Sequence, residues 1–99
     1  MRDNLLKDNL SKALNRVSDR DKIKSIALFG SELKGTARPD SDLDLLIEFK
    51  KPIGYFKLVK IQQTLEESLG RRVDLVTPGS LSKYFKKEVL NQAKVLYER

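Results

Sequence analysis

The chain is 99 residues long and carries 20 Lys and Arg against 14 Asp and Glu, a formal charge of +6, with no His and no Cys. This length predicts one domain over residues 1–99, and the missing residue types exclude thiol or imidazole nucleophiles, a Ser-His-Asp triad and zinc sites. Carboxylates, hydroxyls, Lys, Arg and hard cations remain for chemistry. The mixed charges of the first residues and the short apolar runs predict a cytoplasmic chain without a membrane segment.

The first part of the chain predicts a helix followed by a buried strand. Apolar residues recur at helical spacing over residues 4–17, which is typical of an amphipathic helix that packs against another element. From Lys24 the pattern changes to a short apolar run that ends at Gly30, and such a run indicates a buried strand. Residues 31–41 are interrupted by Gly and Pro and predict a loop.

The second part predicts a strand over residues 42–49, whose alternating side chains give one apolar face and one face that begins with acidic residues. The elements that follow are a helix over 55–69 ended by Gly70, a strand over 72–77 and a helix over 81–93. Periodicity leaves residues 94–98 open between helix and strand. The order predicts an α+β fold with a small mixed β-sheet covered by helices.

Two carboxylates stand at the start of the second predicted strand. Because side chains two residues apart in a strand share a face, Asp42 and Asp44 lie close enough to share a cation or a pair of cations. Asp74 occupies the middle of the third predicted strand, and three carboxylates converge if the two strands are neighbours. Such a set suits two Mg²⁺ ions at a phosphoryl transfer. The alternative is a strand-end Asp74 paired with an adjacent arginine.

Gly30 and Ser31 follow the buried strand directly. A glycine at this point lets a phosphate approach the backbone, and a Ser hydroxyl with the N–H groups of a helix start supplies donors for an anion. The alternative is an ordinary strand exit in which Ser31 caps a helical turn.

Together, three segments resemble the minimal nucleotidyltransferases of the DNA polymerase beta superfamily: Gly30-Ser31 with Gly35, then Ser41-Asp42-x-Asp44-Leu45, then Val73-Asp74-Leu75. The pattern of that family is G-S-x-x-x-G, a short loop, S-D-x-D-L and a later lone Asp. The resemblance runs from about Ile26 to the C-terminus and implies the polymerase beta palm-like fold. It also favours a strand over residues 94–98, because the last segment of the family forms one.

The resemblance implies a nucleotidyltransferase in which Asp42, Asp44 and Asp74 are the catalytic and metal-binding residues. They would hold two Mg²⁺ ions, with Mn²⁺ as a possible substitute. Asp42 and Asp44 would bind the ions that hold the nucleoside triphosphate. Asp74 would complete the site of the ion that activates the attacking hydroxyl.

The same resemblance implies a nucleotide-binding loop beside the metal site. The residues it assigns to ATP are Gly30, Ser31, Lys34, Arg38 and Ser41. Glu32 and Leu33 depart from the family, many of whose members have Arg and Ala at these positions. A positive charge that would face the phosphates is therefore missing at Glu32, and Lys34 or Arg38 is expected to replace it.

Members of this minimal group resemble antitoxins whose partner is an α-helical HEPN-domain ribonuclease. The resemblance implies that this chain transfers AMP from ATP to a tyrosine of such a toxin. With 99 residues the chain has little room beyond a catalytic sheet, so something else must present the acceptor. A partner or a second copy is expected to cover an apolar patch, with exposed aromatic rings among Tyr55, Phe56, Tyr84 and Tyr97.

Two other functions compete with catalysis. A non-catalytic antitoxin would neutralise its toxin by binding alone, but pure binding does not need three clustered acids. A small basic nucleic-acid-binding protein would fit the charge of +6. However, the sequence has no basic helix interleaved with aromatic residues, so direct nucleic-acid binding is not expected.

Overall fold

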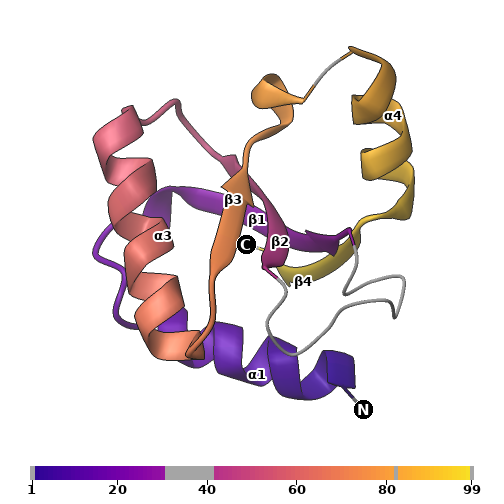
Figure 1. Ribbon diagram of the computed structural model, residues 1–99. Helices are drawn as coiled ribbons and strands as arrows, with labels where there is room; N and C mark the ends of the chain where they lie inside the picture. The colour runs from indigo at the N-terminus through magenta and orange to yellow at the C-terminus, as the bar shows by residue number, and fades with distance from the viewer. Residues whose placement is uncertain (1, 31–41, 82, 99) are drawn as a thin grey trace.

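The computed structural model describes residues 2–30, 42–81 and 83–98. In chain order, the elements are α1 (Arg2–Leu14), the short 3-10 turn η1 (Arg20–Lys22), β1 (Ile23–Phe29), β2 (Leu43–Phe49), α3 (Tyr55–Leu69), β3 (Val73–Val76), the short 3-10 turn η2 (Pro78–Ser80), α4 (Lys83–Gln92) and β4 (Lys94–Glu98) (Figure 1). The predicted α+β fold is confirmed, and so is the strand that the resemblance favoured at the C-terminal end.

The four strands form one mixed sheet in the order β3-β2-β1-β4. β1 pairs antiparallel with both β2 and β4, whereas β2 pairs parallel with β3. A parallel neighbour requires a crossover, and α3 is that crossover. Because the chain returns through α3, the start of β3 lies beside the start of β2. This arrangement brings Asp74 next to Asp44.

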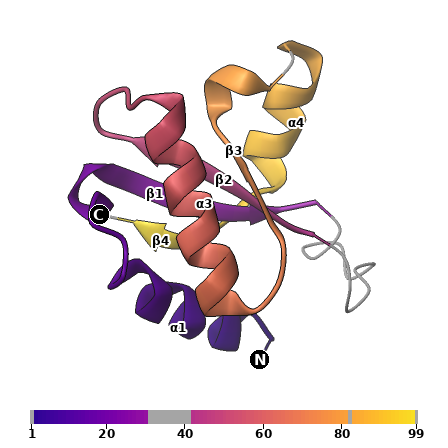
Figure 2. The ribbon, with the colours of Figure 1, turned by 60° about the vertical axis from the view of Figure 1, so that its left-hand side comes forward.

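One face of the sheet is covered by α1 and α3, which pack against each other (Figures 1 and 2). The helical stripes predicted for both helices supply the contacts, and Leu10, Leu14, Ile61 and Leu65 are buried. From the sheet, this cluster takes Ile26, Leu28, Leu43, Leu45, Ile47, Val73, Leu75 and Leu96, among others. This face holds the larger of the two hydrophobic clusters in the described chain.

On the opposite face of the sheet, a smaller hydrophobic cluster packs against α4. Val89 of α4 is buried against Ala27 and Phe29 of β1 and Leu46 of β2. The alternation predicted for residues 42–49 is therefore confirmed, because Leu46 lies on the face opposite Leu45. Asp44, the second residue of β2, lies on the same face as Leu46.

Helix ends account for the differences between the predicted and observed boundaries. α3 ends where predicted: Gly70 adopts a left-handed φ of 69°, and its N–H donates to the Glu66 carbonyl. α1 ends at Leu14 instead of continuing to residue 17, because the next three N–H groups bond to carbonyls three residues back. Val17 follows these tighter turns and is still buried in the larger hydrophobic cluster.

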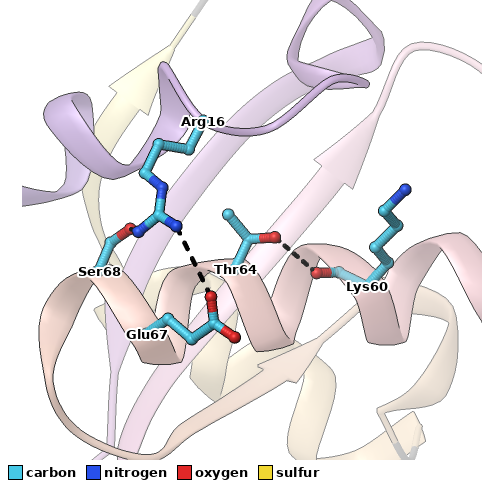
Figure 3. Close-up of polar contacts among 5 residues, drawn as sticks. All are labelled: Arg16, Lys60, Thr64, Glu67 and Ser68. Atoms are coloured by element: carbon cyan, nitrogen blue, oxygen red, sulfur yellow. Dashed lines mark hydrogen bonds and ion pairs between the residues drawn. The ribbon is translucent and has the colours of Figure 1, made fainter.

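The segment after α1 is attached to α3 by a polar contact. Arg16 Nη1 donates to Ser68 Oγ at 2.9 Å, and Arg16 Nη2 lies 3.7 Å from Glu67 Oε2 (Figure 3). In the same view, Thr64 Oγ1 donates to the Lys60 carbonyl within α3. These groups are exposed, so the apolar stripe beneath them carries most of the packing energy between the helices.

The expected exposed aromatic rings are found in part. Tyr55 is 75% exposed and Phe56 is 89% exposed, as predicted. Tyr97 is instead half-buried and packs against the larger cluster, next to an irregularity in the pairing of β1 with β4. The side chain of Tyr84 lies outside the described residues. No helix in the described part of the chain is long and apolar enough to cross a membrane.

Candidate active site

Gly30 and Asp44 are packed against each other where β1 ends and β2 begins. β1 and β2 pair so that Phe29 stands opposite Asp44, and Gly30 follows with a φ of 79°. A Cβ added at Gly30 would overlap the Asp44 carboxylate and lie 3.0 Å from Asp44 Cγ. Glycine is therefore required twice here, for the left-handed backbone and for the space that the carboxylate occupies.

Asp44 and Asp74 are direct neighbours across the parallel strands. The register pairs Leu43 with Val73 and Asp44 with Asp74. Strands in a sheet lie about 4.8 Å apart, and paired side chains share a face. The neighbour relation between the two acidic strands, which the sequence predicted only conditionally, is confirmed.

Asp42 lies one residue before β2 and is exposed. One residue separates it from Asp44, which is half-buried and has a polar partner within the structure. Asp74 is exposed, and no ion pair joins it to a neighbouring arginine in the described chain. The alternative in which Asp74 is neutralised by an adjacent arginine is therefore not what the structure shows.

The register of β3 is set from both sides. Glu66 Oε2, in the last turns of α3, accepts the Val73 N–H at 3.0 Å, and the Leu43 N–H donates to the Arg72 carbonyl at 2.9 Å. Together these bonds hold the first residue of β3 between α3 and β2, one position before Asp74. The sequence did not identify Glu66, because a glutamate near the end of an amphipathic helix looks like any solvated residue.

The chemistry of this donor set fits a hard cation. Carboxylate oxygens are the ligands that Mg²⁺ prefers, and it commonly takes one or two of them together with substrate phosphates. As positioned, no three acidic side chains in the described ranges form a single metal-binding group. Asp42 and Asp74 are exposed, however, and exposed side chains change rotamer rapidly.

Part of the predicted nucleotide site lies outside the described residues. Of the positions assigned to ATP, only Gly30 is described. Ser31, Lys34, Arg38 and Ser41 belong to the segment 31–41 and are not described. Gly30 and Asp42, the described residues on either side of this segment, lie next to the start of β2.

Comparison with known proteins identifies the class. A family model described as a nucleotidyltransferase domain matches residues 10–96, and the chain belongs to that family. Nucleotidyltransferases of this family typically depend on a metal ion. The acidic positions on β2 and β3 and the glycine at the end of β1 lie within the matched range.

Relatives in sequence narrow the activity to protein adenylylation. The chain is 38% identical over 74 residues to the protein adenylyltransferase MntA of Thermococcus cleftensis, covering 75% of each chain. It is 36% identical over 85 residues to a Methanocaldococcus jannaschii protein assigned by inference to the protein adenylyltransferases, covering 85% of this chain and 87% of the relative. The predicted enzyme class is confirmed.

Solved structures agree with this assignment. A toxin-antitoxin structure with AMP-PNP matches with a TM-score of 0.76 and 28% identity, covering 94% of this chain and 73% of the other. A complex of a tri-AMPylated Shewanella oneidensis HEPN toxin with an MNT antitoxin matches with a TM-score of 0.71 and 25% identity, covering 98% and 73%. The fold is that of the minimal nucleotidyltransferases.

Proposed function

We propose that this chain is an antitoxin that transfers AMP from ATP to a tyrosine hydroxyl of a HEPN-domain toxin. The observation that carries this proposal is the register of three strands, which sets Gly30, Asp44 and Asp74 side by side. The relatives support the acceptor, since one solved complex contains an AMPylated HEPN toxin. Residues 1–99 would act as one domain, and the lack of cysteine together with the use of ATP favours the cytoplasm.

Each acidic residue has a different task in this proposal. Asp42 and Asp44 hold the side of the site that receives the triphosphate, and the absence of a side chain at Gly30 leaves room for the Asp44 carboxylate. Asp74, on the outer strand of the sheet, faces the side from which the acceptor hydroxyl approaches. Ser31, Lys34, Arg38 and Ser41, which lie in the sequence between β1 and β2, are proposed to contact the phosphates.

Two Mg²⁺ ions, or Mn²⁺ in their place, would supply charge neutralisation at the phosphates and a lowered pKa at the acceptor hydroxyl. Asp42, Asp44 and Asp74 are the residues that would hold them. In the transfer, the tyrosine oxygen forms a bond to the α-phosphorus of ATP, the bond from that phosphorus to the α,β-bridging oxygen breaks, and pyrophosphate leaves. The phenolic proton is lost to solvent or to a carboxylate of the site.

The test is transfer of AMP to the cognate toxin. The purified chain and the toxin would be incubated with MgATP and, in separate reactions, with each of the other nucleoside triphosphates. Intact mass would show whether the toxin gains AMP residues. We expect gain with ATP and none after Asp42→Asn with Asp44→Asn. Asp8→Asn, an exposed aspartate on α1, is the matched control and should transfer normally.

The same variants separate catalysis from neutralisation by binding alone. If the double variant transfers no AMP but still protects cells that express the toxin, binding alone is sufficient and the catalytic proposal is wrong. Loss of protection together with loss of transfer, with the Asp8→Asn control intact, supports adenylylation as the mechanism.

A further inference from the structure

A pocket lies at the end of β2 opposite the acidic site. It has a volume of about 440 Å³ and is formed where η1, the end of β2 and the start of α3 meet. Its lining includes Lys22, Lys50, Lys51 and Lys57 together with Asp21 and Gly54. β2 has seven residues, so roughly 20 Å of strand separates this pocket from Asp44.

The charge of this pocket is strongly positive. Four lysines line it against one aspartate. Lys22 is partly neutralised by Asp19, whose Oδ1 lies 3.3 Å from its Nζ, but neither Lys50 nor Lys51 takes part in an ion pair with a described residue. Like charges gathered around one cavity repel each other, and an anion in the cavity relieves that repulsion.

The lysines are brought together by the fold and do not form a single run in the sequence. The Lys50 N–H donates to the Lys22 carbonyl at 2.8 Å, which joins the end of β2 to η1. From α3, the Lys57 side chain lies beside the Lys22 amino group, and the Asp19 carboxylate raises the pKa of Lys22. Three elements thus converge on one cavity, with Lys22 charged at neutral pH.

The first turn of α3 adds donors to the same wall. Gly54 lines the pocket and precedes the helix, and it has no side chain to cap the first N–H groups. The first turn carries no acidic residue, so the positive end of a 15-residue helix faces this region uncompensated by its own side chains. Backbone N–H groups and ammonium groups together are the usual means of holding a phosphate.

We propose that the pocket formed by Lys22, Lys50, Lys51 and Lys57 binds phosphate groups, as a site separate from the nucleotidyl-transfer site. Its volume exceeds that of one phosphate, so the ligand is a multiply charged phosphate compound or the phosphates of a nucleic acid strand. Both sources present the same chemistry to the lysines. This site does not depend on the proposed acceptor or on the metal site.

The two aromatic side chains beside the pocket make a ligand that carries bases more favourable than an acidic peptide. Tyr55 and Phe56 follow Gly54 directly, and their rings lie 6.5 Å apart in an edge-to-face arrangement with most of their surface exposed. Exposed aromatic faces next to a basic cavity are typical of surfaces on which bases stack. The sequence did not predict this basic pocket, because its four lysines come from three separate elements.

The test uses pyrophosphate as the probe, with EDTA present so that phosphate binding at the carboxylates has no metal ion to depend on. Calorimetry would compare the full chain with Lys50→Gln/Lys51→Gln, and with Lys86→Gln/Lys87→Gln as a control of equal charge change on α4. The substituted residues, Lys50, Lys51, Lys86 and Lys87, are all exposed, so neither variant disturbs the core. We expect the first variant to lose about tenfold or more in affinity, since charge-assisted contacts are removed, and the control to lose little.

A short single-stranded oligonucleotide under the same conditions distinguishes the sources. Tighter binding than pyrophosphate, weakened by Lys50→Gln/Lys51→Gln and by Phe56→Ser, assigns the pocket to nucleic acid phosphates. Pyrophosphate binding alone assigns it to a small phosphate compound. The proposal is overturned if neither probe binds, if both lysine variants lose affinity equally, or if a poly-glutamate peptide binds where both phosphate probes fail.

Discussion

Replacing Gly30 with alanine tests the contact at the centre of the candidate site. An alanine there must adopt a φ near 79°, which costs roughly 1–2 kcal/mol for a residue with a Cβ. The new Cβ would also overlap the Asp44 carboxylate and force it to move. The strain alone should lower the Tm by about 4–16 °C in a chain of this size.

Gly70→Ala is the matched control. Gly70 has nearly the same φ, 69°, but nothing lies within 4 Å of a Cβ added to it. It should therefore show the backbone strain without the collision. Any excess in Gly30→Ala over this control measures the displacement of Asp44, because the two variants share the strain.

The activity of the two variants should differ far more than their stability. A misplacement of about 1 Å at a catalytic group costs on the order of 10²-fold in rate. AMP transfer, assayed by intact mass well below both melting temperatures, should fall by about that factor in Gly30→Ala and stay near normal in Gly70→Ala. Equal transfer by the two variants would refute the reasoning, since the Gly30–Asp44 contact would then have no part in catalysis.

Three further predictions address the acids and the core. Asp74→Asn should keep MgATP affinity within several-fold by calorimetry but lower transfer by about 10²–10³, and transfer at the normal rate would make Asp74 a structural residue. Mg²⁺ should raise the Tm of the parent in a thermal melt, whereas Asp42→Asn/Asp44→Asn should melt higher than the parent without metal and not respond to it; an unresponsive parent would contradict a carboxylate site. Leu65→Ala, at a fully buried position, should cost about 2–5 kcal/mol in denaturant unfolding against about 0.5 or less for Phe56→Ala, and similar losses would contradict the packing described.

The acidic end of β2 could be predicted from sequence because it depends on local periodicity. Alternation over residues 42–49 fixes which side chains share a face, whatever the strand pairs with, and the structure places Leu45 and Leu46 in different clusters as that rule requires. The end of α3 at Gly70 is local in the same sense, because a left-handed cap needs only the glycine itself.

The contacts that depend on register could not be predicted in the same way. Whether Asp74 stands beside Asp44 is decided by the return of the chain through α3, so the residues alone predicted it only on the condition that the two strands are neighbours. The collision between a Cβ at residue 30 and the Asp44 carboxylate needs the pairing of β1 with β2. The lysine pocket needs three elements to meet, and no spacing in the sequence indicates that.

Glu66 joins α3 to the start of β3, one residue before Asp74. Its carboxylate accepts the Val73 N–H at 3.0 Å, in a partly buried bond between the helix and the first residue of β3. Glu66→Ala leaves that N–H without its acceptor, which costs about 1–3 kcal/mol. Glu66→Gln keeps an oxygen at the same reach and should recover most of the loss. Glu67→Ala is the control, because its contact with Arg16 is an exposed ion pair at 3.7 Å and contributes little.

A loosened β3 should lower the rate of transfer more than the affinity for nucleotide. Asp42 and Asp44 lie at the start of β2, which is held by β1 on its other side, so the KM for ATP should stay near that of the parent in Glu66→Ala. The kcat for AMP transfer should fall, because Asp74 is the carboxylate attached to the loosened strand, and Glu66→Gln should restore it. If Glu66→Ala loses the expected stability but keeps the parent kcat, then Glu66 only stabilises the fold, and the position of β3 is secured by its pairing with β2 alone.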